Sequence, residues 1–528
     1  MRKFILSSIV VLFGFSVTFY INWDKDIKVI GSTLAQFFQK TEIPINKDII
    51  VKFFQKYPKL KKYESEVISL YKNRNYKSIW YDDNNLIDFA NSLYFKLNSL
   101  EEEGFNSERM DYQEIVDMIL DSDLKMKPSK TDTEIMLSAM YVFYVQKVFR
   151  GIDENNVKKI GWLLPKKKVS YGAILDSLLL NPKLLSFNDN IQYEQYYQLR
   201  EALKKYREIE KSGDWKTIQM DSAVKNYKPL DTSKTVAEIR HRLAILGDLE
   251  QDSKSPVYDH EMMSGVMRFK KRNGFYGNYI ITHTHVDKMN TPVQEYIRKI
   301  KLNMERCRWI DPKLTKDSEY IIINIPAFEL FYKKEGVTAL ESRLIVGQDM
   351  METVIFKGYI SSIVFSPYWN VPQSIIDTEI KYGMKEDPNY LASNNMEWNG
   401  GKVRQKPGHD NPMGLVKFVF PNSNSIYLHD TPAKILFGAE YRAFSHGCIN
   451  MEKAKELALL VLKNDPDWPE DRIKEAMKGE KETTCVLKNK IPIYVCYFTS
   501  WVDERGIIHF YDDLYNRDHK LDSLLFRN

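Results

Sequence analysis

The feature that most constrains the fold is a change of hydrophobic period near Tyr320. Upstream of it, apolar residues recur three and four positions apart among Lys and Glu, as in 133–149, which is typical of amphipathic helices. From 320 to 347 the sequence YIIINIPAFELFYKKEGVTALESRLIVG alternates, and Lys-Lys-Glu-Gly breaks it, which predicts a β-hairpin. Strand patterns continue through 357–367 and 414–430. The sequence therefore predicts a multidomain α+β chain, with a helical N-terminal part and a mainly-β part after it.

Length and charge narrow the class of protein. The chain has 528 residues, enough for three or four domains. Its 76 basic and 71 acidic side chains are intermixed and leave a net charge of only +5. This balance lacks the basic patch of a nucleic-acid-binding protein, so no nucleic-acid partner is expected.

The N-terminus predicts a membrane anchor. Arg2 and Lys3 precede a mostly apolar run over residues 4–23, which is close to the roughly 20 residues of a membrane span. No Ala-x-Ala cleavage site follows this run. The sequence also has no Cys near residue 20, which a lipoprotein would need. Basic residues before the run place everything after it outside the cytoplasm. Residues 1–23 are therefore predicted to be an anchor, with a cleaved signal peptide as the alternative.

Helical patterns fill the next 280 or so residues. Residues 24–230 read as one helical region. Within 232–300, an amphipathic helix begins near a Ser/Thr cap and ends at Gly247, a second helix runs from His260 to Asn273, and a third starts at Thr284. A further helix over 291–310 leads into the strands. Cys307 on that helix is expected to pack in the core.

A compact set of reactive side chains lies in the strand-rich part. His429-Asp430-Thr431-Pro432 is followed by Ser445-His446-Gly447-Cys448. A thiol attacks only as thiolate, and an imidazole is its usual base. We expect His429 at a strand end and Cys448 at the start of a helix over 449–462, where the helix macrodipole favours the thiolate. The alternative is that Cys448 is a small buried apolar residue.

The segment YLHDTPAKILFGAEYRAFSHGCIN (427–450) resembles the signature of the YkuD-type L,D-transpeptidases. The resemblance extends to FSPYWNVPQSI (365–375), KEDPNYLASNN (385–395) and the stretch 405–432, and LYKNRNYKSIWYDDNNL (70–86) resembles the start of the family's scaffold domain. It covers most of residues 70–520 and points to the large class with a scaffold domain and a peptidoglycan-binding domain. Asn450 stands where many members of that class have Arg.

The resemblance implies a domain plan: a helical scaffold over 24–230, a three-helix peptidoglycan-binding-like module over 232–300, and a mainly-β catalytic domain over 315–470. An inserted lid would cover the active site from about 373 to 412, and residues 480–528 would form a C-terminal hairpin segment. Cys485 and Cys496 flank Ile491-Pro492 and could face each other, but we expect them to be unpaired core residues.

The resemblance also implies the chemistry. Cys448 would form a thioester with a peptidoglycan stem tetrapeptide, release D-alanine, and pass the acyl group to a neighbouring stem as a 3→3 crosslink. His429 would be the base. The backbone N–H groups of His446, Gly447 and Cys448 would form the oxyanion hole, with Ser445 and His446 in support. Asp430 or a backbone carbonyl would orient His429. The expected substrate-binding residues are Tyr427, Arg442, Trp369, Asn370 and Asp430.

The same resemblance implies carbapenem-type β-lactams as inhibitors, no cofactor, and a periplasmic site on the inner membrane of a bacterial envelope. Three rival functions remain. An L,D-carboxypeptidase would use the same residues with water as acceptor. A non-catalytic wall-binding protein would need no intact Cys448 and His429. A metal hydrolase could use His409, Asp410, His429, His446 and Cys448, but the last two are too close in sequence for convergent ligands, so no metal is expected.

Overall fold

The structure is a computed structural model, which describes residues 43–82, 85–105, 128–181, 191–423, 426–479 and 481–526. The chain divides into two compact units. The first contains the described residues of 43–91 and 128–140, and the second contains those of 92–105 and 141–526. The predicted anchor over residues 4–23 lies outside the described residues. None of the helices in the described ranges is long and apolar enough to cross a membrane.

The first unit is helical, as predicted. Its elements are α3 (Lys47–Lys56), η2 (Pro58–Tyr63), α4 (Glu64–Lys72), the pair β1 (Tyr81–Asp82) and β2 (Asn85–Leu86), and the first parts of α5 (Asp88–Asn98) and α7 (Lys130–Tyr144). Its core contains the buried carboxylate of Glu134. This side chain accepts the N–H of Ile79 at 2.5 Å and of Trp80 at 3.1 Å, and the hydroxyl of Tyr71 at 2.8 Å. Glu134 thus fixes the turn before β1 to helix α7.

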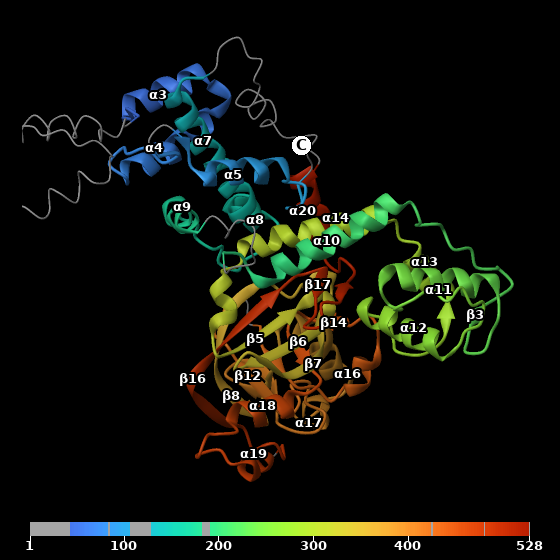
Figure 1. Ribbon diagram of the computed structural model, residues 1–528. Coiled ribbons are helices and arrows are strands. Elements are labelled where there is room, and N and C mark those ends of the chain that lie inside the picture. The colour runs from blue at the N-terminus through green and yellow to red at the C-terminus, as the bar shows by residue number, and fades with distance from the viewer. Residues whose placement is uncertain are drawn as a thin grey trace, which may run out of the picture. The chain divides into compact units, whose positions relative to one another are not determined.

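Helices also begin the second unit. They are the π-helical turn η4 (Val145–Arg150), α8 (Glu154–Lys159), α9 (Tyr171–Leu180), α10 (Glu194–Ser212) and α14 (Val293–Trp309). Helices α10 and α14 pack side by side (Figure 1). The buried stripe of α14 includes Ile300, Met304 and Cys307, each fully buried. The packing role predicted for Cys307 is therefore confirmed.

A small helical group lies between α10 and α14 in the chain (Figure 1). It consists of α11 (Lys234–Leu246), α12 (His260–Arg272) and α13 (His283–Met289), with β3 (Asn226–Tyr227) paired to β4 (Ile281–Thr282). The hydroxyl of Ser233 caps α11 by accepting the N–H of Val236, and Gly247 ends it in the left-handed conformation. The three expected helices are confirmed, whereas peptidoglycan binding by this group stays a prediction.

The mainly-β part is a closed barrel. Within the described residues it contains a nine-stranded sheet in the order β14-β7-β15-β13-β12-β8-β16-β5-β6. Strand β7 closes the ring, because its first half pairs with β6 and its second half pairs with β15 and β14. The strands are β5 (Glu319–Asn324), β6 (Glu329–Lys334), β7 (Val337–Gly347), β8 (Phe356–Phe365), β12 (Val416–Val419), β13 (Leu428–His429), β14 (Ala443–Ser445), β15 (Ile449–Met451) and β16 (Thr483–Cys496).

Alternation explains the barrel's interior. On each strand every second side chain points inward, so Ile321 and Ile323 of β5 are fully buried. Phe418 of β12, Leu428 of β13 and Ile449 of β15 are likewise fully buried. Each such side chain contributes roughly 1.5–3 kcal/mol of burial free energy. The helices between β15 and β16 are α18 (Ala454–Leu462) and α19 (Glu470–Ala476).

The segment expected to be a lid forms its own small substructure. It contains α15 (Gln373–Ile375), the π-helical turn η9 (Ile376–Ile380), α16 (Lys381–Glu386), α17 (Tyr390–Ser393), β10 (Met396–Asn399) and β11 (Lys402–Gln405). The strand β9 (Trp369–Asn370), which precedes the expected lid, pairs with β11 to complete a three-stranded sheet. Val371, Ile376, Ile380 and Val403 form its core. A lid function for this segment stays a prediction.

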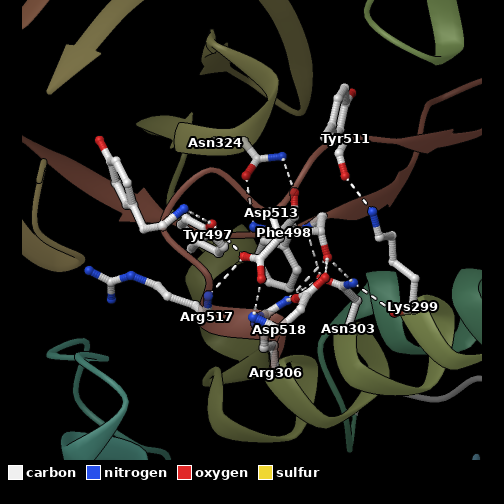
Figure 2. A network of polar contacts seen from close by, with 12 residues as sticks. Lys299, Asn303, Arg306, Asn324, Tyr497, Phe498, Tyr511, Asp513, Arg517 and Asp518 are labelled. Carbon is white, nitrogen blue, oxygen red and sulfur yellow. Dashed lines mark hydrogen bonds and ion pairs between the residues drawn. The ribbon is translucent and has the colours of Figure 1, made fainter. Parts of the chain in front are cut away.

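Of the segment over 480–528 that was expected to form a C-terminal hairpin, Thr483–Cys496 instead forms β16 of the barrel, because it pairs with β8 and β5. A hairpin follows as β17 (Ser500–Val502) and β18 (Ile508–Phe510), and then an unexpected helix α20 (Arg517–Phe526). Figure 2 shows how a buried polar network ties this segment to α14 and β5. Asn303 of α14 accepts the N–H of Thr499 at 3.0 Å, and Asn324 of β5 accepts that of Phe498 at 2.8 Å. Asp513 accepts the hydroxyl of Tyr497 at 2.7 Å. These contacts hold the C-terminal segment beside the helical layer.

Candidate active site

The two central residues lie at the ends of neighbouring parallel strands, His429 on β13 and Cys448 just before β15. β13 pairs with β15, with Leu428 opposite Ile449 and His429 opposite Asn450. His429 ends β13, as expected. Cys448 immediately precedes β15, and the helix α18 begins only at Ala454. The expected helix start at Cys448 was therefore wrong, because pairing of 449–451 with β13 and β7 overrides the local helical pattern, and no macrodipole acts on this thiol.

Strand register gathers the reactive side chains on the outer face of the barrel. Phe418, Leu428 and Ile449 point inward and are fully buried, so their neighbours in sequence point outward. Lys417 of β12 lies directly opposite His429 in an antiparallel pair. Directly opposed side chains have Cβ atoms about 4.5–5.5 Å apart. The outer face therefore presents Lys417, Tyr427, His429 and Cys448 together.

His429 is held as a neutral imidazole. Its side chain is buried, and Nδ1 lies 2.6 Å from the carbonyl oxygen of Asp430. A carbonyl only accepts, so Nδ1 carries the hydrogen and Nε2 keeps its lone pair. Burial lowers the pKa of His429 to about 4, assisted by the charge of Lys417 and opposed by the Asp430 carbonyl. Of the two orienting groups expected from the sequence, the structure has the backbone carbonyl.

The Asp430 carboxylate instead shapes the loops around His429. It accepts the N–H of Leu415 at 2.9 Å and the ammonium of Lys434 at 2.6 Å. Gly414 packs so closely on it that a Cβ there would lie 2.5 Å from an Asp430 oxygen. Asp430 is thus a structural anchor of the strand end rather than a group in contact with His429's ring.

Cys448 is half-buried and not in a disulfide. Burial raises the pKa of its thiol, whereas a backbone hydrogen bond from Tyr427 and the charge of Lys417 lower it. The other cysteines, Cys307, Cys485 and Cys496, are buried and free, which confirms the expected unpaired state of the last two. Among the described cysteines, Cys448 is therefore the most accessible thiol.

The motif around Cys448 is folded into a tight loop. Ser445 Oγ donates to the Cys448 carbonyl at 2.5 Å and accepts the Gly447 N–H at 3.2 Å. Gly447 has φ of +99°, a conformation that only glycine adopts without strain. The supporting role expected for Ser445 fits this geometry. The Gly447 N–H is engaged by Ser445, so it would have to turn away to serve an oxyanion hole.

A second loop, which contains Thr353, holds this motif in place through hydrogen bonds. The fully buried hydroxyl of Thr353 donates to the Gly447 carbonyl at 3.0 Å and accepts the Gly347 N–H at 2.9 Å. The hydroxyl of Tyr515, from the C-terminal segment, donates to the Gly347 carbonyl at 2.6 Å and accepts the Thr353 N–H at 3.2 Å. No motif in the sequence signalled Thr353 or Tyr515, because they are remote from Cys448 in the chain.

The remaining expected residues are placed as follows. Tyr427 lies beside Cys448, with the ammonium of Lys417 3.6 Å from the centre of its ring. Arg442 donates to the carbonyls of Ala439 at 2.7 Å and Leu344 at 3.1 Å, so its guanidinium braces loops. His446 is exposed beside Cys448. Trp369 packs on the core of the inserted segment, and Asn370 is exposed on β9.

Lys417 is a further site residue that the sequence motifs did not reveal. It lies opposite His429, and its charge acts on both His429 and Cys448. The sequence did contain a signal for it. Val416–Val419 alternates as a strand that lies next to the motif, and Lys417 is at one of its outward-pointing positions. Within the described residues, no group of three or more His, Cys, Asp or Glu side chains could hold a metal ion.

Comparison with known families now identifies the domains. Residues 318–469 match the YkuD family, the L,D-transpeptidase catalytic domain, and residues 65–203 match the Scaffold domain. The chain carries an L,D-transpeptidase catalytic domain preceded by a Scaffold domain. The first match contains the barrel strands from β5 to β15 and helix α18, with His429 and Cys448 inside it, whereas strand β16 follows the matched residues.

A relative supports this L,D-transpeptidase assignment. A curated L,D-transpeptidase homologue from Haemophilus influenzae is 32% identical over 245 residues, which are 42% of this chain and 49% of the relative. The chain thus aligns with about half of that relative's length.

Solved structures with similarity include L,D-transpeptidases of Enterococcus faecium and Mycobacterium smegmatis. Each is 14% identical and covers 34% of this chain, with 50% and 58% of the solved chains covered and TM-scores of 0.17 and 0.20. At scores this low, the family assignment rests on the sequence matches.

Proposed function

We propose that this chain is a peptidoglycan L,D-transpeptidase that forms 3→3 crosslinks through a Cys448 thioester. The observation that carries the proposal is the pairing of β13 with β15, which puts a neutral imidazole and a half-buried thiol on one face inside the L,D-transpeptidase domain. Family membership supports the reaction class. The donor and acceptor stems, and the residues named here, are our inference.

In the proposed first step, Cys448 Sγ attacks the carbonyl carbon of the third residue of a stem tetrapeptide. His429 Nε2 takes the thiol proton, since Nδ1 is committed to the Asp430 carbonyl. The S–C bond forms and the C–N bond to D-alanine breaks, with the His429 proton going to the leaving amine. Because the pKa of His429 is lowered to about 4, its protonated form gives up that proton readily.

In the second step, a side-chain amine of a neighbouring stem attacks the thioester. The new C–N bond forms, the C–S bond breaks, and the amine proton returns through His429 to Cys448. Backbone N–H groups of the Ser445–Cys448 loop would stabilise the oxyanion in both steps, with Gly447 released from Ser445. Tyr427 and His446, which flank the thiol, are the proposed walls of the stem-peptide site.

We also propose that carbapenem-type β-lactams acylate Cys448, that residues 4–23 anchor the chain in the inner membrane, and that the enzyme acts on the periplasmic side of a bacterial envelope. The apolar run after Arg2 and Lys3 supports the anchor. The acylation chemistry needs only the thiol and base described above.

The test is muropeptide analysis by mass spectrometry. The full chain in detergent, as wild type, Cys448→Ala and Cys307→Ala, is incubated with purified disaccharide-tetrapeptide. Dimers linked 3→3 with loss of D-alanine, formed by wild type and Cys307→Ala but not by Cys448→Ala, are expected. Tripeptide monomers without dimers would show the L,D-carboxypeptidase instead. Unchanged tetrapeptide with all three proteins would leave a wall-binding role as the better account.

A further inference from the structure

We propose that Lys417 is a positioning residue whose ammonium group is the counter-charge of the Cys448 thiolate. The proposal deepens the function above by naming the group that sets the charge state of the nucleophile. It concerns the thiol itself, so it can be tested without a peptidoglycan substrate.

The geometry comes from strand register. Lys417 on β12 lies directly opposite His429 on β13, and β13 lies beside the strand that Cys448 precedes. All three side chains lie on the outer face, because the residues that alternate with them are buried inside the barrel. The Lys417 ammonium is further held 3.6 Å from the centre of the Tyr427 ring, whose π face attracts a cation. Tyr427 in turn gives Cys448 its backbone hydrogen bond.

Other charged groups around this site do not replace Lys417. Asp430 forms an ion pair with Lys434, in which Oδ1 and Nζ are 2.6 Å apart. Burial lowers the pKa of Lys417, and the charge of Glu482 opposes this effect. The Glu482 carboxylate accepts the Tyr368 N–H at 2.8 Å. His446 lies exposed beside the thiol. Lys417 is the cation whose charge acts on both Cys448 and His429 in the described site.

A cation that faces both members of a thiol–imidazole pair has a definite effect. The pair shares one ionisable proton, which lies on sulfur or on nitrogen, and its loss leaves thiolate with neutral imidazole. The Lys417 charge favours the thiolate and disfavours the imidazolium, so it promotes this loss in either case. The Lys417 charge therefore offsets the effect of burial, which raises the pKa of Cys448. It also lowers the pH at which the Cys448 thiol becomes nucleophilic.

The experiment is alkylation of the full chain by iodoacetamide between pH 5 and 10, followed by peptide mass spectrometry. Rates are compared for wild type, Lys417→Met, Lys417→Gln and Lys417→Arg. Cys307, Cys485 and Cys496 are buried and serve as internal reporters of folding, because they react only when the chain opens.

An opposite charge at close range shifts a pKa by about 1–3 units. The Cys448 midpoint should therefore rise by about one pH unit or more in Lys417→Met and Lys417→Gln, with about tenfold slower alkylation at pH 7. Lys417→Arg keeps the charge and should restore the wild-type midpoint. Profiles of both neutral variants that superimpose on wild type would overturn the proposal, as would a midpoint in Lys417→Arg that moves with theirs. These outcomes are independent of whether dimers, tripeptides or no product form in the muropeptide test.

Discussion

The hydroxyl of Thr353 joins the Ser445–Cys448 loop to the end of β7, because it donates to the Gly447 carbonyl and accepts the Gly347 N–H. Gly347 leaves no room for anything larger, since a Cβ there would lie 3.0 Å from the Gly447 Cα. The two glycines and one hydroxyl thus set where Cys448 lies relative to His429. A side chain 95 positions upstream of Cys448 is therefore part of its support.

Thr353→Val should weaken this support while keeping the shape of the side chain. It leaves a buried carbonyl and a buried N–H without their partner, which costs about 1–3 kcal/mol. We expect about tenfold slower alkylation of Cys448 at pH 7 and faster hydrogen exchange in 443–451. Thr353→Ser retains the hydroxyl and should behave as wild type. An unchanged alkylation rate in Thr353→Val would show that the loop holds its position by other contacts.

Tyr515→Phe should act through the same clamp from the C-terminal side. The variant loses the hydroxyl that contacts the Gly347 carbonyl and the Thr353 N–H. Because both residues serve one network, their effects should not add, with a coupling energy of about 0.5–3 kcal/mol in a double-mutant cycle with Thr353→Val. Unfolding of the four proteins in urea provides the measurement. Strict additivity would mean that Tyr515 does not support the clamp.

Gly447→Ala should strain the loop. Gly447 has φ of +99°, where an L-residue is strained, although its added Cβ would meet only ordinary contact, 3.6 Å from the Met351 carbonyl oxygen. The cost, about 1–2 kcal/mol, is therefore backbone strain rather than a clash. Gly438→Ala is the matched control, since a Cβ there meets nothing within 4 Å and its φ is not positive. Of the two variants, only Gly447→Ala should change the midpoint of thermal unfolding and the rate of Cys448 alkylation.

His429 should make the stability of the catalytic domain depend on pH. Its pKa is about 4 in the folded chain, against about 6.5 when unfolded, so the unfolded state binds the extra proton between these values. Stability from the neutral imidazole is complete above about pH 6.5 and falls by roughly 3 kcal/mol as the pH drops to 4. Hydrogen exchange in peptides covering β12 and β13 measures this. His429→Gln should lose less stability over the same window, and an equal loss would refute the assignment.

Glu134→Gln should destabilise the first unit without touching the catalytic domain. The carboxylate accepts two backbone N–H groups and a tyrosine hydroxyl, and an amide nitrogen in its place cannot accept. Loss of buried hydrogen bonds to a charged group costs about 1.5–3 kcal/mol each. Limited proteolysis should cut 43–91 faster in this variant. Glu66→Gln on the neighbouring helix α4, at a partly exposed position, should leave the digestion pattern unchanged.

Much of the architecture could be predicted from the sequence, because the hydrophobic period is a local property. The helices around Gly247, His260 and Thr284 and the strands after Tyr320 form where their patterns predict. Where the prediction failed, the cause was tertiary. Ile449–Met451 resembles the first turn of a helix in sequence, but it lies between β13 and β7, and two ladders of backbone hydrogen bonds outweigh a weak local preference.

What the sequence by itself determined was the candidate pair, the Cys448 thiol and the His429 imidazole, since these residue types in one short motif predict nucleophilic chemistry. The tertiary structure alone decided what surrounds them. It brought Lys417 opposite His429 through strand register, and it chose a backbone carbonyl rather than a carboxylate to orient the imidazole. It also placed Thr353 and Tyr515 behind Gly447. These relationships depend on closure of the barrel by β7, which joins residues far apart in the chain, and no local pattern encodes such contacts.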